Sequence, residues 1–189
     1  ESLVFDPRGE LLLAGGGPRL DKSAGRGGYV RALRVPSLAE AWRVQAPPRV
    51  EVLLAQEERI LVGCTLGDLI ELDRAGQRVR AFAAPAESLG RGAADFASRK
   101  GVGHRGCLTA LWASRDGKLL VSGARDPNPG GALTEVRLWD LSSGEHLGWL
   151  ELEGFTLAGL AVDPERRLLA LGGREGSLQL WSLDALETE

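Results

Sequence analysis

The chain has 189 residues, of which 43% are hydrophobic and 26% charged, and its formal net charge at pH 7 is −3. This length can bury a sizeable core, and an acidic chain has no overall attraction for nucleic acid or for an anionic membrane. No apolar run approaches the roughly 18 residues of a membrane-spanning helix, and the opening stretch ESLVFDPRGE has no leader pattern. We therefore expect a soluble cytoplasmic protein, with neither nucleic acid nor a membrane as its partner.

Cysteine usage and coding composition add two expectations. Cys64 and Cys107 lie in apolar segments and match no CxxC spacing, so we expect two buried thiols in a reducing compartment. Arg far outnumbers Lys, and Met is absent. This composition is typical of GC-rich coding and favours a bacterial source, and the missing Met indicates that residue 1 is not a natural start.

Four similar segments follow one another along the chain, each a turn followed by an apolar run that ends in small residues. They are DPRGELLLAGG, QEERILVGC, SRDGKLLVSG and DPERRLLALGG. Aligned at Gly15, Cys64, Gly123 and Gly172, they recur every 49 to 59 residues. Such a period is slightly above the roughly 40 to 45 residues of a four-stranded repeat unit, so the excess must lie in loops.

Alternating apolar runs flank each of these segments. The preceding runs are LVF, VEVLL, LTALWA and LAGLAV, and the following runs are GYVRALRV, GDLIELD, TEVRLWD and GSLQLWS. Period-two alternation with β-branched and aromatic residues predicts strands. In three copies a short turn leads to a fourth run: AWRV, VRAF or HLGWLEL. The chain is therefore predicted to be all-β and built from antiparallel meanders, with any helices confined to loops.

The third copy resembles a known family. The stretch GHRGCLTALWASRDGKLLVSGARD, followed by TEVRLWDLSSGEHL, resembles a repeat of the WD-repeat β-propeller family, opened by its Gly-His pair and closed by its Trp-Asp pair. In the last copy Phe155 and Ser182 stand at the His and Asp positions, and the first two copies depart further. The resemblance implies an all-β propeller of four-stranded blades, about four of them present as a partial ring. The blades would span 1–48, 49–103 with an insertion at 84–103, 104–153, and 154–189, the last without its fourth strand.

The resemblance also implies a role for the polar residues of the third copy. In the family, a His before the first strand, a Ser or Thr, an Asp and a Trp form one hydrogen-bonded chain, and the matching residues are His104, Ser122, Asp126 and Trp139. Donors and acceptors balance in such a chain, so every buried polar group can be satisfied. We expect His104 to be structural. The other histidine, His146, has no ligand cluster around it, so no catalytic residue, metal site or cofactor is expected.

The five tryptophans allow two interpretations. They could line an aromatic ligand cage, or they could pack between neighbouring blades, which their strand positions favour. We expect packing.

Three long connections are predicted to share one face. In a meander, the connections between second and third strands lie on the same side as those between successive blades. The segments 17–28, 84–103 and 125–133 are all of this kind, whereas the turns on the opposite side are short. Because long loops in a compact domain are usually functional or disordered, this face is the predicted binding surface.

The 84–103 segment supplies candidate contact residues. Our hypothesis is that Phe96 anchors a protein partner while basic residues form a rim that reads acidic groups. The basic residues are Arg91, Arg99, Lys100 and the nearby Arg105. A flexible, solvated loop is the alternative.

The predicted ring does not close, because the last copy has no fourth strand and a bare edge invites aggregation. We expect the partners to include the remaining blades or another subunit, in addition to a client protein. A longer seven- or eight-bladed propeller and an eight-bladed ring of two copies both remain open.

The sequence is compatible with three functions. The leading one is a non-catalytic interaction scaffold, because the repeat accounts for nearly every notable residue. The alternative is a regulatory or sensor propeller that controls a catalytic domain elsewhere in the polypeptide or complex. A propeller enzyme with its site in the central channel is disfavoured, because only Glu51 and Thr109 are polar on the first strands.

Overall fold

The structure is a computed structural model that describes residues 2–17, 27–46, 49–85, 103–126 and 133–186. It confirms the predicted all-β class, and the one helix among these residues is a 3-10 turn at Leu183–Ala185. The strands are β1 (Ser2–Phe5), β2 (Leu11–Gly16), β3 (Gly28–Arg34), β4 (Glu40–Ala46), β5 (Val50–Ala55), β6 (Arg59–Cys64), β7 (Leu69–Asp73), β8 (Arg78–Phe82), β9 (Cys107–Ala113), β10 (Leu119–Arg125), β11 (Leu133–Asp140), β12 (His146–Glu153), β13 (Leu157–Asp163), β14 (Leu168–Gly173) and β15 (Leu178–Ser182).

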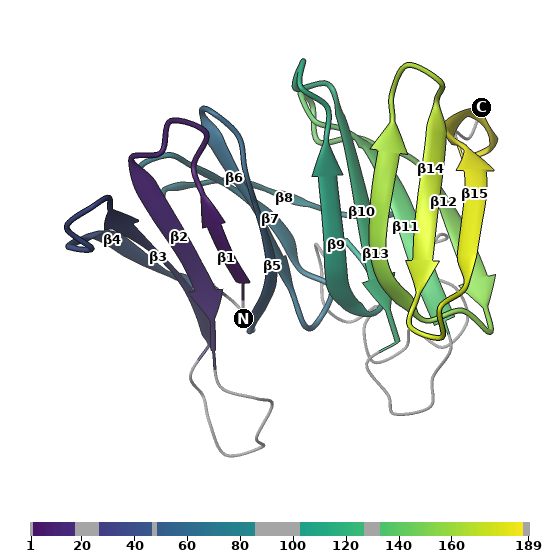
Figure 1. Cartoon of the computed structure of the whole chain (residues 1–189), viewed down its shortest axis with the longest axis horizontal. Coiled ribbons are helices and arrows are strands. Elements are labelled where there is room, and N and C mark those ends of the chain that lie inside the picture. The colour runs from purple at the N-terminus through teal and green to yellow at the C-terminus, as the bar shows by residue number, and fades with distance from the viewer. Residues whose placement is uncertain (1, 18–26, 47–48, 86–102, 127–132, 187–189) are drawn as a thin grey trace.

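These strands form four antiparallel sheets, each a meander in chain order. The first sheet is β1–β4, the second β5–β8, the third β9–β12 and the fourth β13–β15. The first strands of successive sheets lie next to one another, β1 against β5, β5 against β9 and β9 against β13. The sheets therefore stand side by side as an open β-propeller-like array (Figure 1).

Short turns join the strands because aspartates hold the turn backbone. Asp73 and Asp140 end β7 and β11, and each carboxylate accepts two backbone N–H bonds from the following turn at 2.7 to 2.9 Å. These bonds lower the pKa of Asp140. Gly76 (φ +82°) and Gly144 (φ +83°) supply the left-handed residue that each turn needs. The Asp of the Trp-Asp pair is thus a turn residue.

Hydrophobic clusters fill the space between neighbouring sheets, and small residues let the sheets approach. A Cβ added to Gly15 in the first sheet would lie 2.5 Å from Cγ1 of Val50 in the second. A Cβ on Gly123 in the third sheet would lie 2.4 Å from Cδ2 of Leu157 in the fourth. Because cores are packed as densely as organic crystals, glycine at these positions sets the distance between sheets.

The second sheet corrects the sequence alignment by one residue. The equivalent of Gly15 is Gly63, not Cys64, because an added Cβ on Gly63 would meet Leu108 Cβ of the third sheet at 2.9 Å. In this register Gly63 pairs with Val52, and Cys64 pairs with Val50. Cys64 and Cys107 are both free and buried, as expected.

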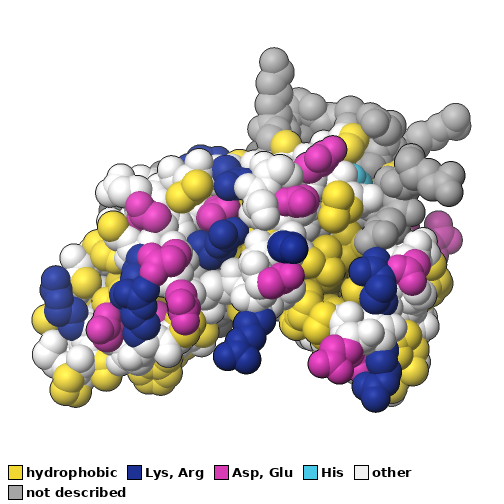
Figure 2. Space-filling view, turned by 90° about the horizontal axis from the view of Figure 1, so that it is seen from above, with side chains coloured by type: hydrophobic (Ala, Val, Ile, Leu, Met, Phe, Trp, Pro, Cys, Tyr) yellow, Lys and Arg dark blue, Asp and Glu magenta, His cyan; other side chains and the backbone are white. Residues whose placement is uncertain are grey.

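Two edges of the array differ in character. The turns between the first and second strands of the sheets lie along the upper edge in Figure 1. The strand ends that border residues 18–26, 86–102 and 127–132 lie along the lower edge, as does the short turn between β14 and β15. Seen from the turn edge, acidic and basic side chains are interspersed (Figure 2). Many of them pair, such as Arg74 with Asp6 at 2.7 Å and Arg166 with Asp163 at 2.7 Å.

Candidate functional site

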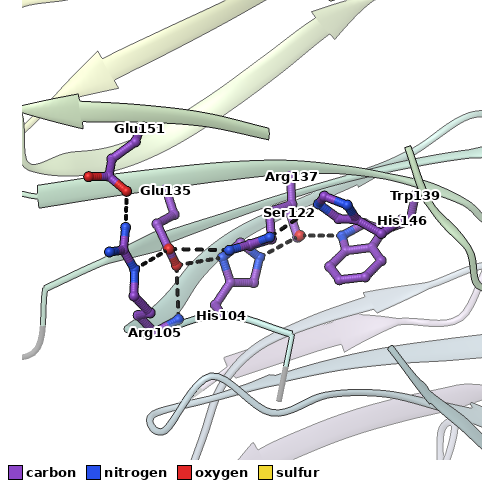
Figure 3. Close-up of polar contacts among 8 residues, drawn as sticks. All are labelled: His104, Arg105, Ser122, Glu135, Arg137, Trp139, His146 and Glu151. Carbon is purple, nitrogen blue, oxygen red and sulfur yellow. Dashed lines mark hydrogen bonds and ion pairs between the residues drawn. The ribbon is translucent and has the colours of Figure 1, made fainter. Parts of the chain in front are cut away.

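A buried polar chain crosses the third sheet (Figure 3). His104 precedes β9, and its Nε2 lies 2.7 Å from Oγ of Ser122 on β10. The indole Nε1 of Trp139, on β11, donates to the same oxygen at 2.8 Å. All three side chains are 0% exposed. The serine hydroxyl on β10 thus links β11 to the residue that precedes β9.

Glu135 continues the chain on the far side of the imidazole. Its Oε2 lies 3.4 Å from Nδ1 of His104. In one tautomer Trp139 donates to Ser122, the serine hydroxyl donates to Nε2, and Nδ1–H faces the Glu135 carboxylate. His104 is therefore neutral in this arrangement.

Burial and charge set the proton affinities of this pair. Desolvation lowers the pKa of His104, and the Glu135 carboxylate opposes this effect only in part. Burial alone would raise the pKa of Glu135, but its contact with His104 and the charge of Arg137 hold that pKa well below its ordinary value. The carboxylate stays ionised in the interior because cations and N–H donors surround it.

Arg105 is placed differently from the expectation that it belongs to a partner-binding rim. Its Nε donates to Oε1 of Glu135 at 2.5 Å, its backbone N–H donates to Oε2 at 2.9 Å, and its guanidinium also pairs with Glu151. The Arg105 side chain is only 15% exposed. Its charge is used inside the third sheet, so it is a structural residue.

The carboxylate that faces His104 was not the one expected from the sequence. Asp126 follows β10, where its backbone N–H donates to the carbonyl of Leu133 at 2.9 Å, whereas the His104 imidazole faces Glu135. One signal could have revealed Glu135: with Arg137 and Trp139 it alternates along β11 and so shares one face of that strand. The other face, with Val136 and Leu138, is also buried, so both faces of β11 are interior.

The buried polar residues of this site link strands of the third sheet, and they expose no reactive group to a substrate. The imidazole is 0% exposed, and general acid–base catalysis needs hydrogen-bond reach to the reacting atom. The described ranges hold no group of three or more His, Cys, Asp or Glu side chains placed for a metal ion. Within the same ranges, no helix is long and apolar enough to cross a membrane.

The other predicted contact residues lie outside the described residues. These are Arg91, Phe96, Arg99 and Lys100, together with most of the segments 17–28, 84–103 and 125–133. The bordering strand ends are described, and they share one edge (Figure 1). The tryptophans mostly pack between sheets: Trp42 Nε1 donates to the Arg74 carbonyl of the next sheet at 3.0 Å, whereas Trp149 is 37% exposed.

Comparison with known proteins finds local similarity to one repeat family. Residues 98–128 match the family described as "WD domain, G-beta repeat", and the polar chain just described begins inside this match. The chain is 35% identical over 83 residues to eukaryotic translation initiation factor 3 subunit I of Candida albicans, covering 44% of this chain and 22% of that protein. It is also 35% identical over 80 residues to mitochondrial division protein 1 of Pyricularia oryzae, covering 42% of this chain and 11% of that protein.

A solved structure supports the same fold. The computationally designed Ika4 protein aligns with a TM-score of 0.63 at 15% identity, over 95% of this chain and 88% of the designed one. These findings together support the WD-repeat family and a β-propeller-like fold. The matched region spans about a fifth of the length of the initiation-factor relatives. A bacterial source is not supported, because these relatives are eukaryotic.

Proposed function

We propose that this chain is a non-catalytic WD-repeat interaction module that serves as a protein–protein scaffold. The observation that carries the proposal is the common edge at which the bases of the three long segments lie (Figure 1). A rigid array of sheets that presents its irregular segments on one side is suited to binding a partner. The family resemblance and the relative named as an initiation-factor subunit favour a protein as that partner.

The client-binding residues of this proposal are Arg91, Phe96, Arg99 and Lys100. Reversing the three positive charges to Glu should lower the yield of partners that are cross-linked to the full chain and identified by mass spectrometry. The matched control reverses Arg115, Lys118 and Arg78, which are exposed in the structure. Equal yields from the two triple variants, with unchanged circular dichroism, would contradict this binding surface.

A second part of the proposal is that the four sheets are blades of a ring completed by further blades. At each internal interface a first-strand leucine faces the second-strand glycine of the preceding sheet. At the middle interface this is Leu108, which lies before the bulge of its strand, and at the first and third interfaces it is a leucine after the bulge. Leu53 Cδ1 and Leu160 Cδ2 would each lie 3.1 Å from a Cβ on Gly15 and Gly123, respectively. The interfaces therefore have a fixed polarity along the array.

Within the described residues, the outer face of the first sheet carries such a leucine with no glycine opposite it, and the outer face of the fourth sheet carries such a glycine with no leucine opposite it. Leu3 is the counterpart of Leu53, because each pairs with the residue just before the glycine of its own sheet, yet Leu3 is 70% exposed. On the fourth sheet, an added Cβ on Gly172 would have only the Gly159 carbonyl oxygen within 4 Å, at 3.8 Å. Leu178 and Leu180 beside it are 70% and 66% exposed.

These outer faces favour a blade-like partner, supplied by a longer chain, another subunit or a second copy. Exposed apolar area of this kind normally marks an interface. Replacing Leu178 and Leu180 by Glu should weaken any assembly measured by light scattering, whereas Val79→Glu on the outer strand β8, where Val79 is 51% exposed, should not. An unchanged mass in both variants would argue against closure through this face.

A further inference from the structure

A cavity of about 260 Å³ opens where the second, third and fourth sheets meet. Its lining residues come from β5, β9, the end of β10, the start of β13 and the residue after β14. They are Glu51, Thr109, Arg125, Leu157, Ala158 and Arg174. Arg125 ends β10 and Arg174 follows β14, and both strands end at the lower edge in Figure 1, so the cavity lies on the edge of the proposed interaction surface.

Two of these side chains lack partners within the described part of the chain. The Nε of Arg125 and the Oγ1 of Thr109 are buried without a hydrogen-bond partner. Among the described carboxylates, none pairs with the guanidinium of Arg125 or of Arg174. A buried donor left unpaired destabilises the protein, and a ligand that accepts its hydrogen bond offsets that loss.

The net charge of the cavity is positive. Glu51 contributes a carboxylate, but Arg49 Nε lies 3.3 Å from its Oε1, so this charge is already compensated. Burial and then Glu51 raise the pKa of Cys107, while Arg125, Arg49 and Arg174 act in the opposite direction. The charged side chains of this cavity therefore all act on the Cys107 thiol, which indicates that they lie close together. Two guanidiniums remain uncompensated, in contrast to the paired arginines of the turn edge (Figure 2).

The geometry favours a single carboxylate as the ligand. A guanidinium presents a fork of N–H donors that matches a carboxylate, and the threonine hydroxyl adds a third donor. The Glu51 carboxylate on the wall disfavours a doubly charged group such as a phosphate. The volume exceeds the roughly 30 Å³ of one water but falls below the roughly 300 Å³ where cofactor pockets begin. These dimensions suit one side chain.

We propose that this cavity binds the carboxylate of an acidic side chain from a partner protein, with Arg125 and Arg174 as the recognising cations and Thr109 as a hydrogen-bond donor. The inference rests on the proposed interaction function and specifies what part of the partner is recognised. None of the loop residues 86–102 is needed for it.

The test uses the full chain and fluorescein-labelled peptides of Gly, Ser and Glu, with matched peptides in which Gln replaces each Glu. Fluorescence anisotropy should show preferential binding of the Glu peptide. The Arg125→Gln, Arg174→Gln double variant should weaken that binding about tenfold, as expected for the loss of roughly 1.4 kcal/mol. The matched control is Arg78→Gln with Arg115→Gln, which removes the same net charge from exposed residues.

The source of the carboxylate is tested by competition. Displacement of the Glu peptide by a Lys-free acidic protein segment at lower concentrations than by free glutarate would support a protein side chain. Displacement by glutarate at equal concentrations would overturn the protein source in favour of a small carboxylate. Equal binding of the Glu and Gln peptides, or equal losses in the two double variants, would overturn the site itself.

The proposed function and this cavity can fail separately. If the charge-reversed loop variant loses its cross-linked partners while the Glu and Gln peptides bind alike, the interaction function stands and the carboxylate site does not.

Discussion

Ser122→Ala is the substitution that most directly probes the polar chain of the third sheet. It removes the one oxygen that accepts from Trp139 Nε1 and contacts His104 Nε2, at 2.8 and 2.7 Å. Both rings are 0% exposed, so water cannot replace the lost oxygen without a packing change. Each of the two stranded groups costs about 1 to 3 kcal/mol, so the expected loss is about 2 to 6 kcal/mol. A domain with a typical stability of about 5 to 15 kcal/mol would lose a large share of it.

Urea unfolding followed by far-ultraviolet circular dichroism measures this loss. The matched control is Ser177→Ala, because Ser177 is exposed in the turn between β14 and β15. In a double-mutant cycle, Trp139→Phe should cost about 1 kcal/mol less in the Ser122→Ala background than alone. A loss below about 0.5 kcal/mol for Ser122→Ala, equal to that of the control, would refute the shared-acceptor account.

Three further predictions concern packing, pH and thiol reactivity. Gly123→Val should lower the free energy of unfolding by about 1 to 3 kcal/mol, because the added side chain overpacks the space between the third and fourth sheets. Gly159→Val should lower it far less, because nothing lies within 4 Å of an added Cβ there. Urea unfolding midpoints measure both losses, and equal shifts would contradict the packing model. Burial lowers the pKa of His104 in the folded state below 6.5. The unfolded chain therefore binds a proton that the folded chain does not, and the free energy of unfolding should fall as pH drops below about 6.5. His104→Gln should flatten this dependence of stability on pH, and an unchanged dependence would exclude His104 as its cause. Cys64 and Cys107 are buried, so an aromatic disulfide reagent should modify them only at the rate of unfolding, and immediate modification in the native protein would contradict their burial.

The fold was largely predictable because its signals are local. Period-two alternation marked the strands to within about two residues, since each inward position contacts a neighbouring sheet. Asp73 and Asp140 marked the turns because their carboxylates bond the next backbone amides. Cys64 was misaligned because the copies were matched at the ends of their apolar runs. In the structure Ile60 and Leu120 each pair with the last residue of the preceding strand, so Gly63, three residues further on, is the equivalent of Gly123.

The site was less predictable because it depends on which side chains meet across sheets. The contacts of His104, Ser122 and Trp139 followed the family resemblance, but the roles of Glu135 and Arg105 did not. Charged residues are expected at the surface, and only their mutual pairing lets them be buried here. The cavity lined by Glu51, Thr109, Arg125 and Arg174 brings together residues that lie far apart in the sequence, so no local sequence motif predicts it.

The central claim is that these sheets are blades whose outer faces associate with further blades. Size-exclusion chromatography with light scattering on the 189-residue chain tests it most directly. We expect a mass above the 20.1 kDa of one chain, which falls when Leu178 and Leu180 are replaced by Glu. A monodisperse, folded species of 20.1 kDa that binds no hydrophobic dye would contradict it.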